Sequence, residues 1–208
     1  DTVAIFGCGP VGQFAIASAF LRDAGRVIAI DTVPSRLEMA RALGAEVIDF
    51  NAEDPVQVIK DLTGGIGVDR VIDAVGVDAE RPHSGPASEK AVQQASQFQQ
   101  EVEQVAPDAN PQGELWQPGD APSQVLTWAV ESVAKAGTIG IIGVYPPAMQ
   151  HYPIGQAMNK NLTLKMGNCN HRRYIPRLVD LVEAGAVTPT KILTQREPLT
   201  DVIAAYKA

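Results

Sequence analysis

The sequence predicts an α/β protein built on a doubly wound parallel sheet of six strands in the order 3-2-1-4-5-6. Three observations lead to this prediction. Short apolar runs rich in β-branched residues alternate with segments of helical spacing. A glycine-rich turn joins the first apolar run to the first helical segment, and an acidic residue ends the second run. Alternating strands and helices imply right-handed crossovers, so the strands are expected to be parallel.

The first two strand–helix units carry the clearest signals. The stretch 2–21 has no charged side chain, but glycines and Pro10 interrupt its centre. It therefore predicts a buried strand, a tight turn and a buried helix rather than a membrane span or a signal peptide. Arg26–Asp31 is apolar with a charge at each end, as in a strand covered on both faces. A helix follows, opened by Pro34 or Ser35 and closed by Gly44.

The same alternation continues along the chain, apart from one long interruption. The expected strands are Val3–Phe6, Arg26–Asp31, Glu46–Asp49, Val68–Val75, Gly137–Val144 and Leu162–Met166, with a further short strand at Lys191–Thr194. The expected helices are Val11–Leu21, Pro34–Leu43, Pro55–Thr63, Val125–Ala134, Tyr174–Ala184 and Leu199–Tyr206.

The interruption runs from about residue 77 to about residue 123. It contains six prolines and several glutamines, and only Ser88–Val105 has a composition that suits a helix, with Ser88 as a candidate cap. A compact domain rarely needs such a long connection, so this segment is expected to be an insertion or lid.

Composition excludes several classes of partner. The chain has 208 residues, with 17 Lys plus Arg against 24 Asp plus Glu and a formal net charge of -7. A nucleic acid or an acidic membrane would require a basic face, so neither is expected as a partner. Cys8 and Cys169 are too few for a disulfide framework or a four-cysteine zinc site, which favours a reducing, cytoplasmic setting.

The turn after the first strand has the spacing of a dinucleotide-binding fingerprint. Gly7 permits a tight turn, Gly9 lets the backbone approach a pyrophosphate, and Gly12 lets the helix pack against the strand. The helix N-terminus then offers free N–H groups to the anion. Asp31 stands at the end of the second strand, where a carboxylate accepts hydrogen bonds from ribose hydroxyls and repels a 2′-phosphate. The pattern predicts a Rossmann fold that binds NAD in preference to NADP.

Several stretches together resemble one family. They are Gly7–Gly12, Asp31 followed by Arg36–Ala45, Val71–Gly76, Gly140–Val144, and the closing Pro198–Leu199 with Ala205–Tyr206. In combination they resemble the cofactor domain of zinc-dependent medium-chain alcohol dehydrogenases, most of all the formaldehyde dehydrogenase branch. The resemblance covers nearly the whole chain except the insertion.

The resemblance implies which residues contact the cofactor. Arg36 would lie beside the adenosine, the ends of the fourth and fifth strands would border the nicotinamide mainly through backbone groups, and Asn168 would reach it from beyond the sixth strand. The full expected set is Gly7, Gly9, Pro10, Val11, Gly12, Asp31, Arg36, Ala74, Val75, Gly143, Val144, Tyr145 and Asn168. No catalytic residue and no metal ligand is assigned within the chain.

The resemblance also implies what is missing. Enzymes of this family carry a separate N-terminal domain that supplies the catalytic zinc ligands and the proton relay, and nothing in residues 1–208 corresponds to it. The chain is therefore expected to be one NAD-binding domain, excised or naturally detached, that binds NAD(H) but does not by itself oxidise an alcohol or a formaldehyde adduct. The apolar edge strand Leu162–Met166 is expected to pair with a second copy, giving a homodimer.

Two other functions are compatible with the same residues. One is a stand-alone NAD-sensing regulatory domain, with the insertion as its contact surface. The other is a methyltransferase, which also combines a glycine-rich first turn with an acidic residue after the second strand. Residues 140–144 and the sixth strand–helix unit favour a dinucleotide-sized site over the methyltransferase.

Overall fold

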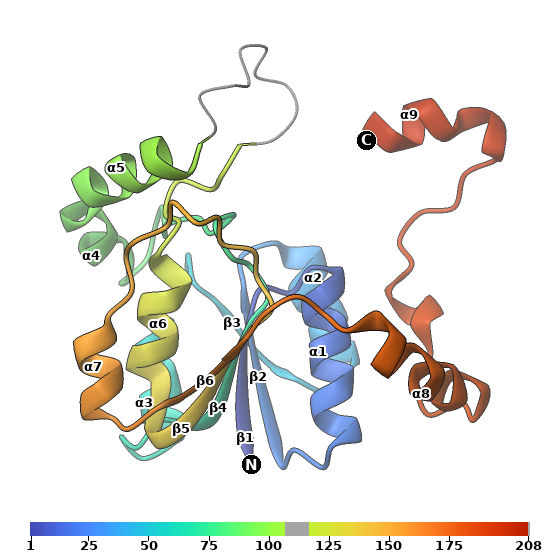
Figure 1. Ribbon diagram of the computed structural model, residues 1–208, viewed down its shortest axis with the longest axis horizontal. Helices are drawn as coiled ribbons and strands as arrows, with labels where there is room; N and C mark the ends of the chain where they lie inside the picture. Colours follow the sequence, from blue (N-terminus) through green and yellow to red (C-terminus); the bar gives the residue numbers. More distant parts are fainter. Residues whose placement is uncertain (107–116, 208) are drawn as a thin grey trace. The chain divides into compact units, whose positions relative to one another are not determined.

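The structure, a computed structural model, describes residues 1–106 and 117–207 (Figure 1). Contacts divide the chain into two compact units, Asp1–Cys169 and Asn170–Ala208. Within the described residues, no helix is both long and apolar enough to cross a membrane.

The first unit is organised around a six-stranded parallel sheet in the order β3-β2-β1-β4-β5-β6, which confirms the prediction from the sequence. The strands are β1 (Thr2–Phe6), β2 (Arg26–Asp31), β3 (Glu46–Asp49), β4 (Val68–Asp73), β5 (Val133–Ile141) and β6 (Thr163–Met166). β1 lies in the middle, where Val3 is opposite Val27 of β2 and Arg70 of β4. The chain reverses its direction of travel across the sheet at this point, so the ends of β1 and β4 flank the switch point where ligands bind in such sheets.

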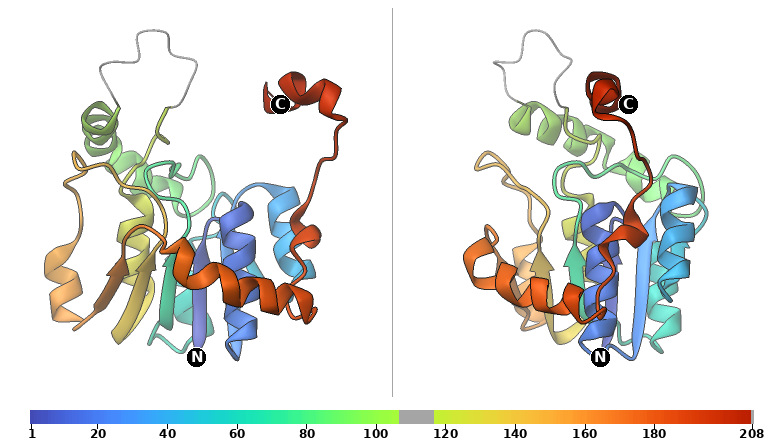
Figure 2. Two further views of the ribbon diagram at one scale, coloured as in Figure 1. Left: turned by 45° about the vertical axis from the view of Figure 1, so that its right-hand side comes forward. Right: turned by 90° about the vertical axis from the view of Figure 1, so that its right-hand side faces the viewer.

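Helices cover both faces of the sheet, and alternate residues of β1 and β2 supply the two cores. On one face, Val3 and Ile5 pack with residues of α1 (Pro10–Leu21) and α2 (Pro34–Ala42). On the other face, Ala4 and Phe6 pack with residues of α3 (Pro55–Leu62) and α6 (Gln124–Ser132). Figures 1 and 2 show these two helical layers on opposite sides of the strands. This period of two is what parallel strands buried on both faces require.

The segment after β4 forms the expected insertion. Its described part contains α4 (Ser88–Gln93) and α5 (Ala95–Val105), whereas residues 107–116 lie outside the described residues. The prediction that Ser88 caps this helix is wrong: Ala87 is the cap residue, and the Ser88 hydroxyl donates to the carbonyl of Gly85. Glu101 anchors α5, because its buried carboxylate accepts hydrogen bonds from the backbone N–H and the hydroxyl of Ser123.

The region around β5 differs from the prediction. The sequence predicts a helix to Ala134 and a strand at Gly137–Val144, but β5 begins at Val133 and ends at Ile141. Ala136 has a φ of 60° in the middle of this strand, and the β4–β5 register shifts between Val68 and Arg70. A left-handed alanine gives no sequence signal, so this irregularity was not foreseen. The short helix α7 (Ile154–Asn159), next to Pro153, was also not predicted.

The second unit contains α8 (His171–Glu183), two 3-10 turns (Pro189–Ile192 and Leu199–Asp201) and α9 (Val202–Lys207). The side chain of Asn170 caps α8 by accepting a hydrogen bond from the backbone N–H of Arg173. The strand predicted at 191–194 is wrong, because the chain there forms the first 3-10 turn. The described residues of this unit include no other strand with which a strand at 191–194 could pair.

Candidate functional site

A cavity of about 420 Å³ opens where β1, β2 and β4 end. This is the carboxyl edge of the parallel sheet, next to the switch point. Its lining combines backbone turns, aromatic rings and charged side chains: Phe6, Gly7, Gly9, Ile30, Asp31, Thr32, Val33, Arg36, Phe50, Ala74, Val75, Asp78, Ala79, Glu80, Val125 and Trp128. The volume lies within the range of small-molecule sites.

The surroundings of the three glycines in the turn differ, so each glycine has a different geometric role. Gly7 has a φ of +87°, and a Cβ there would lie 2.6 Å from Val75. A Cβ on Gly12 would lie 1.8 Å from the carbonyl oxygen of Gly7, so only glycine lets α1 start this close to the turn. A Cβ on Gly9 would meet nothing within 4 Å. Because Gly9 lines the cavity, the open space beside it belongs to the site, and a backbone there can be approached closely.

The start of α1 has the features of an anion-binding helix terminus. Gly9 is the cap residue, Pro10 occupies the first turn, and no side chain caps the helix. The first N–H groups of a helix lack internal partners, and the helix dipole makes them attractive to negative charge. The turn and the helix terminus together suit a phosphate group.

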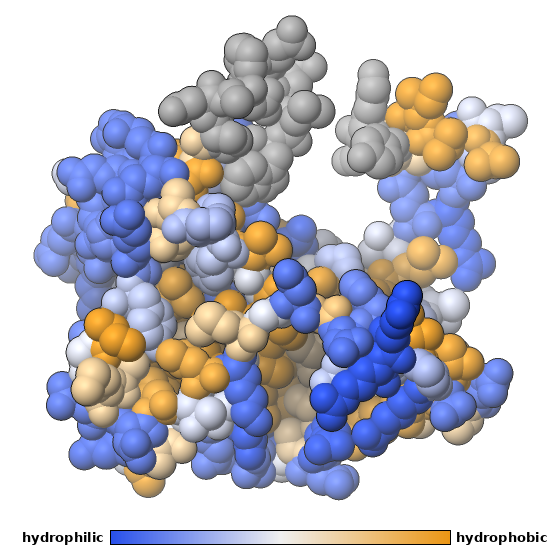
Figure 3. All heavy atoms as spheres, in the orientation of Figure 1, coloured by the Kyte–Doolittle hydropathy of each residue, from blue (hydrophilic) through white to orange (hydrophobic). Residues whose placement is uncertain are grey.

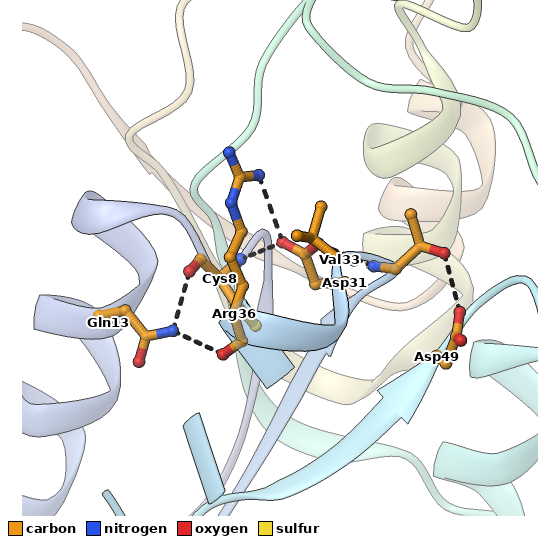
Figure 4. Close-up of polar contacts among 7 residues, drawn as sticks. Cys8, Gln13, Asp31, Val33, Arg36 and Asp49 are labelled. Carbon is orange, nitrogen blue, oxygen red and sulfur yellow. Dashed lines mark hydrogen bonds and ion pairs between the residues drawn. The ribbon is translucent and has the colours of Figure 1, made fainter. Parts of the chain in front are cut away.

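Asp31 connects the cavity wall to the turn through its carboxylate. Oδ2 accepts a hydrogen bond of 2.7 Å from the backbone N–H of Cys8, and Oδ1 accepts hydrogen bonds from the backbone N–H groups of Thr32 and Val33 (Figure 4). The residue is only 7% exposed, yet it lines the cavity. The acid at the end of β2 therefore shapes the turn after β1 as well as presenting a charge to the cavity.

The side chain of Gln13 also holds the turn in place, and this role was not predicted from the sequence. Its buried Nε2 donates to the carbonyl oxygens of Cys8 at 2.8 Å and of Arg36 at 2.9 Å (Figure 4). The side chain thus ties α1, the turn and α2 together. A signal was present: Gln13 is a large amide within the uncharged stretch 2–21, and a buried polar side chain needs partners.

Arg36 brings the positive charge of the cavity wall close to Asp31. Its guanidinium Nη1 lies 3.9 Å from Oδ2 of Asp31, and its side chain is 52% exposed. Arg36 lines the cavity beside the acid that ends β2, and its placement beside an adenosine stays a prediction. Because the guanidinium is half in solvent, its attraction to Asp31 is weak.

The beginning of the insertion is fastened to the end of β3. The backbone N–H of His83 donates to Oδ1 of Asn51, and the hydroxyl of Ser84 donates to the carbonyl oxygen of the same residue. The amide of Asn51 in turn donates to the hydroxyl of Thr32, which lines the cavity. The first residues of this segment, expected to be an insertion or lid, are therefore hydrogen-bonded to Asn51, which contacts the cavity-lining Thr32.

A second polar junction joins the ends of β4 and β5. The hydroxyl of Tyr145 donates to Oδ2 of Asp73 at 2.7 Å, and Oδ1 of this fully buried carboxylate accepts from the backbone N–H groups of Val75 and Gly76. Burial raises the pKa of Asp73, although these hydrogen bonds favour the charged form. Burial and the charge of Asp73 also raise the pKa of Tyr145, which keeps its hydroxyl a donor.

The expected cofactor residues fall into two groups. The cavity is lined by Gly7, Gly9, Asp31, Arg36, Ala74 and Val75. The remaining expected residues lie outside its lining: Pro10, Val11, Gly12, Gly143, Val144, Tyr145 and Asn168. A backbone bridge between Gly76 and Val144 nevertheless brings the β5 end next to the β4 end. Asn168 is exposed beyond β6.

Within residues 1–106 and 117–207, no group of three or more His, Cys, Asp or Glu side chains is arranged to hold a metal ion. Cys8 is buried beside the turn, and burial raises the pKa of its thiol to about 12. This thiol is therefore uncharged and packs as a small apolar group.

The sheet order, the two helical layers and the glycine turn define a Rossmann-like α/β domain. Residues 10–84 match the family described as zinc-binding dehydrogenase. The zinc-type alcohol dehydrogenase-like protein AdhB of Bacillus subtilis is 31% identical over 208 residues, covering 99% of this chain and 48% of AdhB. An alcohol dehydrogenase of Cupriavidus necator is 30% identical, covering 99% of this chain and 45% of its own length.

Solved structures show the same relationship. The alcohol dehydrogenase TADH from Thermus sp. ATN1 superposes with a TM-score of 0.74 at 28% identity, over all of this chain and 48% of that one. The chain is thus similar in sequence and in fold to zinc-type alcohol dehydrogenases over nearly its whole length. It spans about half the length of the curated relatives that it matches.

Proposed function

We propose that residues 1–208 form the NAD-binding domain of a zinc-dependent alcohol dehydrogenase. One observation carries the proposal: the cavity at the carboxyl edge of the sheet is lined by Gly7, Gly9 and Asp31 together. This arrangement combines a close-approach turn for phosphates with an acid for ribose hydroxyls. A structure from Escherichia coli CFT073 with NADH bound has the same fold, with a TM-score of 0.69 at 20% identity.

The residues present fit the dinucleotide. The open space beside Gly9 and the uncapped start of α1 would receive the pyrophosphate, and Asp31 and Arg36 would flank the adenosine ribose. The β4 end at Ala74 and Val75 would border the nicotinamide. When bound, NAD accepts a hydride from the substrate, so the work of this chain is to bind and orient the ring.

The reaction itself is proposed for the whole enzyme. Its substrate would be a small alcohol, or a formaldehyde adduct if the chain belongs to the formaldehyde dehydrogenase branch. Oxidation needs a group that lowers the pKa of the hydroxyl, and we propose that the part of the relatives not covered by this chain holds the zinc that does so. The described residues supply no such ligand group, so we expect residues 1–208 alone to bind NAD without turning over an alcohol.

We also propose that the domain self-associates through β6 and that it works in the cytoplasm. β6 is an edge of the sheet, and Ile154 and Met158 on α7 and Met166 on β6 are more than half exposed. Figure 3 shows apolar surface among polar groups in this region. Pairing of two such edges would cover both strands. Cys8 and Cys169 are free thiols, which suits a reducing compartment.

Calorimetric titration of the 208-residue chain tests the proposal. NAD, NADH and ADP-ribose are expected to bind with one site per chain, and S-adenosylmethionine is expected not to bind. An NADH absorbance assay with added zinc, NAD and primary alcohols or formaldehyde is expected to show no steady turnover. Binding of S-adenosylmethionine without NAD would instead support a methyltransferase and contradict the proposal.

A further inference from the structure

The residues that follow β4 bring two more carboxylates to the cavity. Asp78 and Glu80 line it together with Asp31. Their neighbours Val77 and Ala79 are 3% and 1% exposed, whereas Asp78 and Glu80 are exposed. The turn after Gly76 therefore leaves both acids exposed where they line the cavity, while the residues between and before them are buried.

Backbone hydrogen bonds fix the orientation of this segment from two sides. The N–H of Val77 donates to the carbonyl of Val144, and the carbonyls of Val77 and Ala79 accept from the N–H groups of Gly119 and Ala121. A Cβ on Gly119 would lie 2.1 Å from the carbonyl oxygen of Ala79, so the approach of these two stretches depends on that glycine. The backbone that carries Asp78 and Glu80 is therefore held by hydrogen bonds from two neighbouring stretches.

The described lining of the cavity contains more carboxylates than cationic side chains. Among the described lining residues, three carboxylates (Asp31, Asp78 and Glu80) stand against one guanidinium (Arg36). An arginine near the acid that ends β2 is the kind of residue that accommodates a 2′-phosphate in other dinucleotide sites. Arg36 therefore favours a phosphorylated ribose, whereas the three carboxylates oppose it by like-charge repulsion.

We infer that Asp78 and Glu80 are specificity-determining residues, which act with Asp31 to exclude a dinucleotide that carries a 2′-phosphate. The inference rests on the proposed function. A substitution of Asp31 cannot test the exclusion of a 2′-phosphate by itself, because the carboxylate of Asp31 also accepts hydrogen bonds from three backbone N–H groups. Asp78 and Glu80 are exposed at the cavity, and the hydrogen bonds that hold the glycine turn to the end of β2 go to Asp31, so Asp78→Asn and Glu80→Gln leave those bonds in place.

The test measures dissociation constants for NAD and NADP with the wild-type chain, Glu80→Gln, Asp78→Asn and the double variant. Asp23→Asn is the matched control. It removes one negative charge from the turn before β2, at the opposite edge of the sheet, and asparagine tolerates its φ of 59°. Thermal unfolding of each variant verifies the fold. All titrations are repeated in molar salt, which shortens the Debye length to about 3 Å.

We expect each cavity variant to bind NADP about three- to tenfold more tightly at low salt, with NAD affinity changed less than about twofold. The double variant is expected to gain more than either single variant, and the gains are expected to shrink in molar salt. Asp23→Asn is expected to leave the ratio unchanged. If all proteins bind NAD, but the ratio of the NADP and NAD dissociation constants is the same in Glu80→Gln, the double variant and wild type, this inference is overturned and the proposed function is not. Failure of the wild-type chain to bind either dinucleotide would overturn the proposed function as well.

Discussion

The backbone N–H of Cys8 donates a 2.7 Å hydrogen bond to Oδ2 of Asp31, across a sequence separation of 23 residues. This contact fastens the glycine turn after β1 to the end of β2. Since both residues are buried, water cannot replace the bond if it is lost. The acid expected to select the cofactor is therefore also part of the framework that shapes the cavity.

Asp31→Ala should lower stability as well as NAD affinity. The substitution leaves three backbone N–H groups without their acceptor, and a hydrogen bond to a charged group contributes about 1.5–3 kcal/mol. We expect the free energy of unfolding to fall by about 3 kcal/mol in urea titrations. Asp69→Ala is the control, because its exposed carboxylate accepts one N–H bond, from Thr2, and should cost less than about 1 kcal/mol. Equal losses for the two variants would contradict the structural role of Asp31.

Gln13→Glu should be more damaging than Gln13→Leu. Leucine leaves the carbonyls of Cys8 and Arg36 without a donor, at a cost of about 2 kcal/mol. Glutamate places a carboxylate oxygen against the same two carbonyl oxygens, which adds repulsion to the lost bonds. Denaturant unfolding of both variants measures the order. Gln57→Glu, at an exposed amide bonded to Asp61, serves as control and is expected to have a smaller effect. A Gln13→Glu variant as stable as wild type would rule out this arrangement.

Asp73 should make stability depend on pH in a defined direction. Burial raises its pKa above the ordinary value of 3.8, so between that value and the folded pKa the folded state binds more protons than the unfolded chain. This contribution stabilises the fold at low pH and is lost as the pH rises. Asp73→Asn is neutral throughout, and its amide can still accept from Val75 and Gly76 and donate to Tyr145. We expect the variant to gain stability relative to wild type as the pH rises from about 4 to about 7. Parallel pH profiles would contradict the raised pKa.

The β6 edge should control self-association. Met166 is 65% exposed on this edge strand, and a lysine there would place charges at the proposed dimer axis. Sedimentation velocity should show a dimer for wild type and a monomer for Met166→Lys. Ile66→Lys, at a residue that is 75% exposed in the turn after α3, should remain dimeric. A monomeric wild-type chain at high micromolar concentration would refute the dimer.

The sheet and the glycine turn were predictable because their signals are local. Strand, turn, helix and acid follow one another within the first 31 residues, and the alternation of elements then restricts the strand order. Six of the expected cofactor residues line one cavity: Gly7, Gly9, Asp31, Arg36, Ala74 and Val75. Which of them contacts NAD remains a prediction.

The supporting residues were not predictable, because their partners are distant in sequence or depend on backbone irregularities. Gln13 finds the carbonyl of Arg36, and Asp73 finds the hydroxyl of Tyr145, 72 residues away. Ala136 adopts a left-handed conformation that alanine rarely prefers, so the start of β5 was misplaced. Periodicity describes the faces of elements, whereas these contacts depend on tertiary structure.

Calorimetric titration of NAD into wild type and Gly9→Ala tests the central claim most directly. A Cβ on Gly9 meets no protein atom within 4 Å, so Gly9→Ala should fold with a stability loss below about 1 kcal/mol. The added methyl group occupies the space proposed for the pyrophosphate, so NAD affinity should fall by about tenfold or more. Undiminished NAD affinity in Gly9→Ala, or no NAD binding to wild type, would contradict the assignment of this cavity.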